Sequence, residues 1–555
     1  MRKSPAVFLF FILLFLSAVL FFFKLGDRSF RSPDEGRYAE VSRGMVVSGN
    51  WIEPKIYGVN YLKKPALFYW LVGVFFKTFG FNEWAGRSVP ALFGLFGVLV
   101  TFWFVRKIFD DSAAFFSSLV LASNFWYLEV GRYLVIDAVF SFFVVLGLYC
   151  FYLAASAQKN KLRYYLLFYG CVSFSVLAKG VLGLILPGIS IGLYLGVMKK
   201  ISGTLREMRL GLGALLFALI ALPWFVMVSL KDPEFLKLFF LHENLSRFVS
   251  ANFEHQEPWY FFLVLTPLVL APWSFFWKPL NLKAVWPHKS ESWGDPKIYF
   301  LCASLGMVIF FSISKAKLLT YILPSVPFFS ILIGSAWARW RDLHAQKNAP
   351  FGRKEYVPVF LLIFLGAVVV AGTPNAIKRY GQELPEGMGI YFQCMGAAVL
   401  AGGVSALRAI RRRSVSHLFY ALIFMMVLLS GTFAFAMERM NGDYTNKHFA
   451  LSLKPVLKPG DRVFIYDHPG ALYDFGFYLN TPVTLVGLDG ELELSRNNPE
   501  SAKASVTHEQ FDRMLMNKEK VYCLARKSDF LELEKNLGVR FPVILEDRRK
   551  VLFSA

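Results

Sequence analysis

The sequence predicts a polytopic α-helical membrane protein that ends in a small soluble α/β domain. Of its 555 residues, 55% are hydrophobic and only 18% are charged, and the mean hydropathy is +0.46. A soluble protein of this length needs a charged surface that this composition cannot supply. The apolar residues also fall into long runs separated by short basic loops. The same composition excludes disordered, collagen-like and coiled-coil chains.

About 13 apolar segments have the length of a bilayer crossing. The first covers residues 5–23 and follows Arg2 and Lys3. Bulky phenylalanines stand where a cleaved secretory signal would have small residues, so we expect a retained helix with its basic end in the cytoplasm. The other predicted spans are residues 89–105, 113–128, 136–156, 164–178, 181–197, 210–230, 259–277, 298–313, 318–337, 357–372, 391–407 and 417–436.

Residues 66–79 are also apolar, but we interpret them as an interfacial or re-entrant helix. Counting them as a span would break the alternation of charge between successive loops. Positive-inside sorting places the basic loops in the cytoplasm, and an odd number of spans then places the C-terminus outside, which is the periplasm in a bacterium. The basic loops are residues 106–107, 159–163, 199–209, 278–297, 339–354 and 408–413.

Charge and cysteine content narrow the range of partners. A net charge of +21 suits a protein that lies among anionic lipids. Lys and Arg are spread over short loops and do not gather on one soluble domain, which argues against a nucleic-acid partner. The five cysteines show no metal-ligand spacing, so the sequence predicts neither a zinc site nor a disulfide framework.

The composition predicts two domains. Residues 1–437 form a transmembrane domain, whose first periplasmic loop at residues 24–88 carries interfacial helices. Residues 438–555 form a periplasmic α/β domain. No internal repeat supports the inverted-repeat architecture of many transporters. The expected strands of the tail are residues 463–466, 483–486, 521–524 and 541–544, and the expected helices include residues 509–515 and 530–537.

The first periplasmic loop begins with a helix-start signal. Ser32 suits the N-cap, Pro33 the first helical position and Glu35 the reciprocal position of a capping box. For Glu35 this structural role competes with substrate binding, and both interpretations remain open.

Asp34 lies in the same segment and shares a helix face with Arg37 and Tyr38. A carboxylate, a guanidinium and a phenol at a membrane surface suit the binding of a sugar and a phosphate, so Asp34 is a candidate functional residue.

Two lysines, Lys63 and Lys64, follow Tyr61 in front of residues 66–79. Paired lysines often only anchor a helix at the interface. On the predicted orientation, however, they lie on the outer side, where the positive-inside tendency disfavours them. Lys64 is therefore a candidate ligand for a lipid phosphate.

Further polar residues fall on the same outer side. Charges at membrane depth are costly and usually face a cavity, although Lys179 could instead extend to the interface and His255 could be structural. These residues are Arg132, Asp137, Lys179, His255, Lys317 and Tyr321.

Seven segments carry a family resemblance, and they occur in the order PDEGRYAEVSR, YLKKPALFYW, VIDAVF, LAKGVLGLILPG, ALPWFVMV, FFLHENLSRF with HQEPWYF, and FFSISKAKLLTYILP. Together they resemble the membrane glycosyltransferases that use polyprenyl-phosphate sugars and have the C-type glycosyltransferase fold. Within these, the chain is most similar to the undecaprenyl phosphate-α-4-amino-4-deoxy-L-arabinose arabinosyl transferases, which modify lipid A. The resemblance covers the whole chain.

The resemblance implies that Asp34 and Asp137 are the two catalytic acidic residues and that Lys64 holds the carrier phosphate. Lys317 and Tyr321 match an element that lines the carrier-lipid site, although Leu319 stands where the family often has proline. With the residues singled out above, the substrate-binding candidates are Glu35, Arg37, Tyr38, Tyr61, Arg132, Lys179, His255, Lys317 and Tyr321.

Lys63 departs from the family pattern. Relatives commonly place a glutamate there, which together with the histidine matched by His255 can resemble a metal site. Lys63 removes that carboxylate, so we expect no required metal and no cofactor.

The sequence therefore predicts an enzyme that moves 4-amino-4-deoxy-L-arabinose from undecaprenyl phosphate to a lipid A phosphate, a lipopolysaccharide modification linked to polymyxin resistance. One alternative is a related transferase that moves mannose, galacturonic acid or another hexose to a protein or glycolipid. Another is a lipid-linked-sugar transporter, which the gathering of polar residues at one face disfavours. The expected partners are the lipid-linked sugar donor, lipid A and membrane lipids, and we expect a monomer in the bacterial inner membrane.

Overall fold

The structure, a computed structural model, describes residues 5–237, 239, 256–276, 296–347, 351–381, 384–467, 469–488, 492–493 and 498–555. The chain forms two compact units. Unit 1 consists of Met1–Lys24, Pro90–Pro223 and Asn244–Arg439. Unit 2 consists of Leu25–Val89, Trp224–Glu243 and Met440–Ala555, so it joins the first loop to the C-terminal tail.

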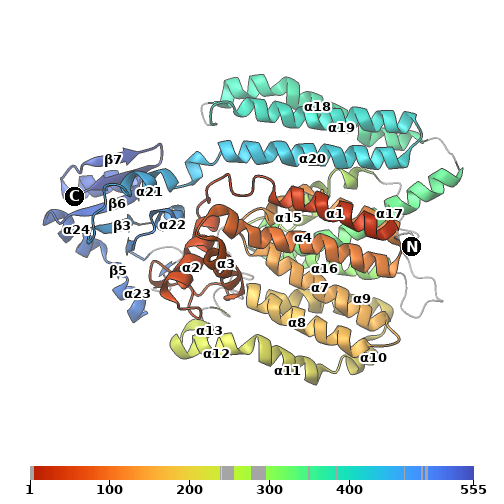
Figure 1. The fold of residues 1–555 in the computed structure, drawn as a ribbon, viewed down its shortest axis with the longest axis horizontal. Helices are drawn as coiled ribbons and strands as arrows, with labels where there is room; N and C mark the ends of the chain where they lie inside the picture. Colours follow the sequence, from red (N-terminus) through yellow and green to blue (C-terminus); the bar gives the residue numbers. More distant parts are fainter. Residues whose placement is uncertain are drawn as a thin grey trace. The chain divides into compact units, whose positions relative to one another are not determined.

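Unit 1 is built from apolar helices (Figure 1). Within the described ranges, seven helices are long and apolar enough to cross a membrane, or nine if two bent pairs each count as one span. The predicted total of about 13 spans remains a prediction. The helices of unit 1 are α1 (Pro5–Phe22), α4 (Glu83–Ile108), α5 (Asp111–Ala122), α6 (Phe125–Gly131), α7 (Asp137–Ser156), α8 (Lys161–Lys179), α9 (Leu182–Met198), α10 (Ile201–Glu207), α11 (Leu210–Ile220), α15 (Phe261–Val269), α16 (Pro296–Ile313), α17 (Val326–Lys347), α18 (Arg353–Tyr380), α19 (Met388–Arg411) and α20 (Val415–Arg439), with 3₁₀ turns η2 (Trp273–Phe275) and η4 (Leu319–Ser325). The first turns of α4 and most of α12 (Leu222–Lys231) belong to unit 2.

Two segments that the sequence predicts as straight spans are bent. Residues 113–128 divide into α5 and α6, which meet at 64°, and residues 210–230 divide into α11 and α12, which meet at 45°. The first break lies at Asn124, whose side-chain oxygen accepts a hydrogen bond from Tyr127 N and so caps α6. Hydropathy reports the composition of a segment and not its direction, so it does not reveal such breaks.

Close helix packing holds unit 1 together. Helices α18, α19 and α20 run side by side (Figure 1), α7 packs on α8, and α5 packs on α17. The α5–α17 contact depends on Gly334, because a Cβ at that position would overlap the backbone of Ser117. Such small residues let helix backbones approach closely in a membrane, where van der Waals contact drives association.

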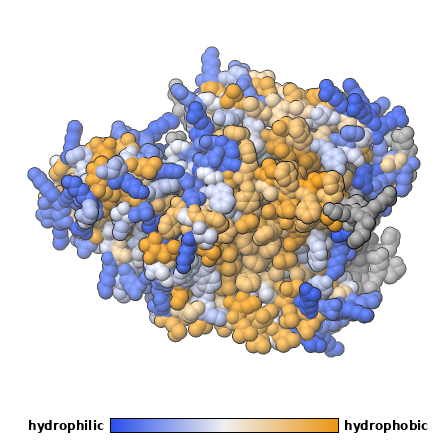
Figure 2. All heavy atoms as spheres, viewed as in Figure 1, coloured by the Kyte–Doolittle hydropathy of each residue, from blue (hydrophilic) through white to orange (hydrophobic). Residues whose placement is uncertain are grey.

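The outer surface of unit 1 remains apolar. Figure 2 shows hydrophobic side chains gathered over the region that Figure 1 draws as α1, α4, α8 and α9. Phe8 and Phe15 of α1, Trp103 of α4 and Leu184 of α9 are among the exposed large hydrophobic residues. A surface of this kind suits lipid and not water as its surroundings.

Unit 2 contains a six-stranded sheet, which confirms the predicted α/β tail. Its strand order is β5-β4-β3-β6-β8-β7, with β3 to β6 parallel and β8 antiparallel to both β6 and β7. Phe464, Cys523 and Phe553 from three adjacent strands are fully buried and join the core beside Phe511 and Phe530 of two flanking helices. The strands are β3 (Arg462–Tyr466), β4 (Thr484–Val486), β5 (Ser505–Val506), β6 (Val521–Arg526), β7 (Val543–Glu546) and β8 (Lys550–Ser554), and the helices are α21 (Lys447–Leu453), α22 (Asp474–Leu479), α23 (Pro499–Lys503), α24 (His508–Met516) and α25 (Lys527–Leu537), with 3₁₀ turns η6 (Gly442–Tyr444) and η7 (Pro469–Leu472).

The first loop supplies the remaining elements of unit 2 together with the short helix α13 (Phe235–Lys237). Helix α2 (Asp34–Ser48) is followed by the two-residue strands β1 (Lys55–Ile56) and β2 (Val59–Asn60) and by α3 (Leu67–Phe79). With 13 residues, α3 is shorter than the roughly 20 residues that a spanning helix needs, in keeping with its interpretation as an interfacial or re-entrant helix.

Candidate active site

The start of α2 presents the carboxylate that the sequence singles out. Asp34 is the first residue of the helix, and its side chain is 51% exposed. Arg37, one turn on, donates a hydrogen bond from Nη2 to Asp34 Oδ1 at 2.5 Å. The predicted sharing of a helix face by Asp34 and Arg37 is therefore confirmed. The guanidinium is mostly buried, so it holds Asp34 from the protein side and leaves the carboxylate accessible.

The predicted capping box is wrong. Helix α2 begins at Asp34 with Pro33 as N-cap residue, and no side chain caps it. The Ser32 hydroxyl instead donates to Asp474 Oδ1 at 2.5 Å, and Glu35 Oε2 accepts from Arg31 N at 3.1 Å. Ser32 and Glu35 are engaged by other partners because the first loop folds against the rest of unit 2.

Glu35 lies in a fully buried ion pair. Arg87, in the first turns of α4, donates from Nε to Glu35 Oε1 at 2.7 Å and from Nη2 to Oε2 at 2.8 Å, and both side chains have no exposed surface. The same guanidinium also donates to three backbone carbonyls of the first loop, those of Leu25, Arg28 and Ser29. This geometry gives Glu35 a role in holding the loop.

Aromatic residues continue the Asp34–Arg37 cluster. The Arg37 guanidinium carbon lies 5.4 Å from the ring centroid of Tyr38 and 5.8 Å from that of Tyr61. Both tyrosines are buried, and Tyr38 packs edge to face on Phe68 of α3. Tyr61 therefore places the turn that carries Lys64 against α2, and Lys64 itself is half-buried.

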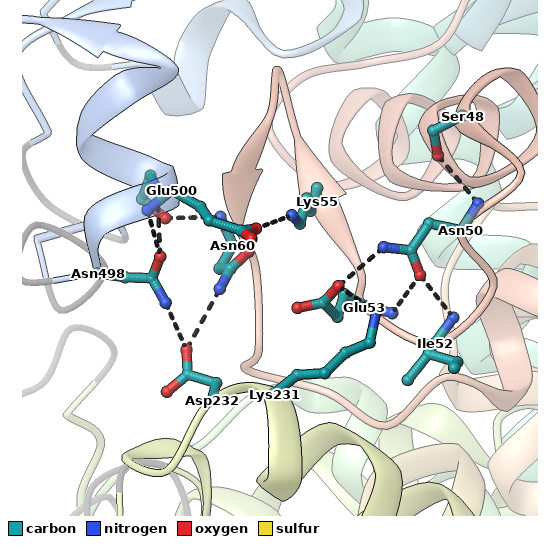
Figure 3. Close-up of polar contacts among 11 residues, drawn as sticks. Ser48, Asn50, Ile52, Glu53, Lys55, Asn60, Lys231, Asp232, Asn498 and Glu500 are labelled. Carbon is teal, nitrogen blue, oxygen red and sulfur yellow. Dashed lines mark hydrogen bonds and ion pairs between the residues drawn. The ribbon is translucent and has the colours of Figure 1, made fainter.

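A polar network fixes the far side of this loop (Figure 3). Glu53 Oε2 accepts hydrogen bonds from Asn50 Nδ2 at 2.8 Å and from Lys231 Nζ at 2.9 Å. Burial opposes ionisation of Glu53, but these two donors and the nearby Lys55 charge together outweigh it and hold the pKa of Glu53 below its ordinary value. Nearby, Asp232 Oδ2 accepts from Asn60 at 3.2 Å and from Asn498 at 3.0 Å.

In unit 1, Asp137 and Lys179 form a further charged pair. Asp137 begins α7 and Lys179 ends α8, positions where the helix dipoles favour an acid and a base respectively. Lys179 Nζ lies 2.6 Å from Asp137 Oδ1, and both side chains are about nine-tenths buried. The ammonium also lies 4.9 Å from the ring centroid of Tyr321. The structure thus brings together three predicted site residues, and Lys179 is paired instead of extending to the interface.

Lys317 and Arg132 contact backbone carbonyls of unit 1. Lys317 Nζ donates to Glu257 O at 2.7 Å and to Ser314 O at 2.6 Å. Burial and the neighbouring Lys315 lower the pKa of Lys317. Arg132 donates to Phe23 O at 2.7 Å and also to Leu20 O, so it caps the C-terminal end of α1.

His255 lies outside the described residues, so its predicted role remains a prediction. Within the ranges that the structure covers, no group of three or more His, Cys, Asp or Glu side chains is arranged to hold a metal ion. The expectation that no metal is required stays a prediction, because the site that can resemble a metal site in relatives includes the position of His255.

Sequence reasoning missed the residues that hold the first loop in place. Arg87 carried a signal, since it is a charge at the edge of a predicted span, but its partner Glu35 is 52 residues away. Asp474 carried none, because its contact with Ser32 joins positions 442 residues apart.

The fold is that of a C-type membrane glycosyltransferase. The structure aligns along all of this chain and 98% of the crystallised ArnT from Cupriavidus metallidurans bound to undecaprenyl phosphate, with a TM-score of 0.83 and 24% sequence identity. A family model described as dolichyl-phosphate-mannose-protein mannosyltransferase matches residues 32–239, which include the Asp34–Arg37 and Asp137–Lys179 pairs.

The sequence relatives are more specific. An undecaprenyl phosphate-α-4-amino-4-deoxy-L-arabinose arabinosyl transferase from Aeromonas hydrophila is 30% identical over 419 residues, which is 74% of this chain and 72% of the relative. A second one, from Pseudomonas fluorescens, is 28% identical over 516 residues, 91% of this chain and 85% of the relative. The chain belongs to the undecaprenyl phosphate-α-4-amino-4-deoxy-L-arabinose arabinosyl transferase family.

Proposed function

We propose that this glycosyltransferase moves 4-amino-4-deoxy-L-arabinose from undecaprenyl phosphate to a phosphate group of lipid A, on the periplasmic side of a bacterial inner membrane. The family membership supports the donor and the sugar. The observation that carries the assignment of the site is the accessible Asp34 carboxylate, which Arg37 holds beside the turn that bears Lys64.

The reaction exchanges one phosphate for another at the anomeric carbon. An oxygen of the acceptor phosphate forms a bond to that carbon, and the bond to undecaprenyl phosphate breaks, so the carrier leaves with the electron pair. Negative charge grows on the departing phosphate. Lys64 would stabilise this charge, with Arg37 as a second cation, because preorganised cations act strongly where water is excluded.

Asp34 is suited to act on the acceptor phosphate and on the sugar. A lipid A phosphate is already an anionic nucleophile, so transfer does not need a strong general base. We infer that Asp34 orients the acceptor or stabilises the positive charge that develops on the sugar. Its exposure also permits an ion pair with the cationic 4-amino group of the donor. Asp137 is proposed as the second catalytic acidic residue, positioned by Lys179.

Mass spectrometry of lipid A tests this function. In a host that lacks its own transferase but makes the donor, expression of the chain should add one aminopentose residue per modified phosphate. Asp34→Ala and Lys64→Ala should each abolish the new species while the protein still accumulates in the membrane. Lys161→Met, which changes an exposed lysine paired with Glu207, is the matched control and should transfer normally.

Two outcomes would contradict the proposal at different points. If lipid A is unchanged although expression and membrane insertion are demonstrated, the enzyme must use another sugar or another acceptor. Near-normal turnover by purified Asp34→Ala or Lys64→Ala would instead remove these residues from the catalytic site while leaving the substrate assignment intact.

A further inference from the structure

A short helix of the C-terminal sheet region packs along the helix that carries Asp34. Helix α22 follows strand β3, and Gly476 N donates to Tyr57 Oη at 3.1 Å while Tyr57 Oη donates to Tyr473 O at 2.6 Å. At the far end, Arg43 of α2 donates to Asn480 Oδ1 at 3.3 Å. All these residues belong to unit 2. Helix α22 is therefore a fixed neighbour of the first loop.

The contact at the start of α2 is made by Asp474, the first residue of α22. Its side chain has no exposed surface. Oδ1 accepts hydrogen bonds from the Ser32 hydroxyl at 2.5 Å and from Asn446 Nδ2, and Oδ2 accepts from Thr445 Oγ1 at 2.9 Å and from Asn446 N at 2.6 Å. All four donors are neutral. Burying a carboxylate costs free energy, which these hydrogen bonds offset while fixing the geometry around Ser32.

The backbones of the two helices also touch at this point. A Cβ at Gly36 would lie 2.7 Å from Asp474 N and 2.9 Å from Asp474 Cβ, closer than van der Waals contact allows. Gly36 stands in the same first turn as Asp34 and one residue before Arg37. Any change in the position of α22 therefore acts directly on the turn that carries the Asp34–Arg37 pair.

We propose that Asp474 is a positioning residue of the transferase, which fixes the first turn of α2 from the C-terminal domain and so sets the direction of Asp34. This inference rests on the proposed function of Asp34. A displacement of a catalytic group by about 1 Å can lower a rate about 100-fold. Asp474→Asn replaces one acceptor oxygen by a donor and so leaves a hydrogen-bond conflict in the cluster. We expect it to lower kcat about 10- to 100-fold, while KM for the lipid-linked donor changes less than about threefold.

The test compares steady-state transfer by purified full-length variants. Gly36→Ala disturbs the same contact from the side of α2 without changing a charge, and it should show the same loss of kcat with little change in KM. Two variants serve as controls and should turn over normally. Asp461→Asn changes a carboxylate that is paired with Lys520 elsewhere in the C-terminal domain, and Gly431→Ala adds a Cβ that would meet nothing within 4 Å.

Ser32 supplies a second pair of variants if Asp474→Asn does not fold. Ser32→Ala removes only the hydroxyl that joins the loop to Asp474, and Ser32→Thr retains it. A lower kcat in the alanine variant that the threonine variant restores supports the proposal, and equal kcat in both overturns it.

The possible results distinguish a failure of this positioning role from a failure of the proposed function. Normal kcat in Asp474→Asn and Gly36→Ala, in an assay where Asp34→Ala is inactive, overturns the positioning role alone. Activity in Asp34→Ala, or no aminoarabinose transfer by the unmodified protein, overturns the proposed function instead.

Discussion

Removing the Arg87 guanidinium is the sharpest test of how the first loop is held. In Arg87→Met, Glu35 remains buried with only the more distant Arg28 guanidinium, 3.8 Å away, as a cation, and the five hydrogen bonds that Arg87 donates to the carboxylate and to the loop carbonyls are lost. Breaking one side of a buried ion pair costs about 3–5 kcal/mol. At about 2–4 °C per kcal/mol for a unit of this size, the unfolding midpoint should fall by about 6–20 °C.

The assay is thermal unfolding of the purified protein in detergent, followed by tryptophan fluorescence. Lys161→Met again serves as a control, because its pair with Glu207 is exposed and should contribute no more than about 1 kcal/mol. A midpoint for Arg87→Met within about 2 °C of the unmodified protein would refute the reasoning that this pair stabilises the loop.

A double variant decides between the two interpretations of Glu35. Replacing a buried ion pair by apolar side chains of similar volume is often close to neutral, so Glu35→Leu combined with Arg87→Met should recover much of the lost stability. If Glu35 acts only in holding the loop, transfer should return together with stability. Restored stability without transfer would make Glu35 a substrate ligand, as the sequence also allows.

Two further predictions concern the other charged pairs. Lys179→Met leaves Asp137 buried without its cation, so it should lower the free energy of unfolding by about 3–5 kcal/mol and abolish transfer. Lys179→Arg keeps the charge and should retain most of the stability. Equal unfolding midpoints for the two variants would contradict a stabilising role of the Asp137–Lys179 pair. Glu53 has a pKa held below its ordinary value of 4.5, so its ionised form stabilises the fold above that pH and the stabilisation is lost as the pH falls through the lowered pKa. Between pH 7 and pH 4 the unfolding midpoint of the unmodified protein should therefore fall more than that of Glu53→Gln, and parallel curves for the two proteins would contradict this.

The sequence predicts the positions of helices well, because hydropathy identifies apolar segments directly. The predicted span at residues 136–156 corresponds to α7 (Asp137–Ser156), and the predicted strand at residues 463–466 corresponds to β3 (Arg462–Tyr466). Breaks within apolar segments were missed, since the direction of a chain depends on local caps such as Asn124. Strand β8 was also missed, because it lies in the basic stretch around Lys550 and is recognisable mainly through its pairing with β6.

The candidate site could be predicted only as a set of residues. Spacing on one helix turn is a local property, and it correctly joined Asp34 to Arg37. The pairing of Asp137 with Lys179 follows from the packing of α7 on α8, which no local pattern encodes. For the same reason, the sequence could offer Arg132 only as a charge on the outer side and could not show that it caps α1.

The neighbouring carboxylates Asp34 and Glu35 show what the structure adds. In the sequence they are nearly equivalent acids, yet one side chain is half exposed and the other is fully buried. Successive residues of an α-helix point about 100° apart, so adjacent acids at the start of α2 cannot face the same surroundings. Glu35 points inward to Arg87, and this anchor fixes the helix one residue from the carboxylate that we propose meets the substrate. Catalytic groups need supporting contacts that hold them within about 0.5 Å of the productive position. The buried acid, the Arg37 pair and the Asp474 contact together supply such support to a single exposed side chain, which is why Asp34 and not Glu35 is the acid best placed to act in transfer.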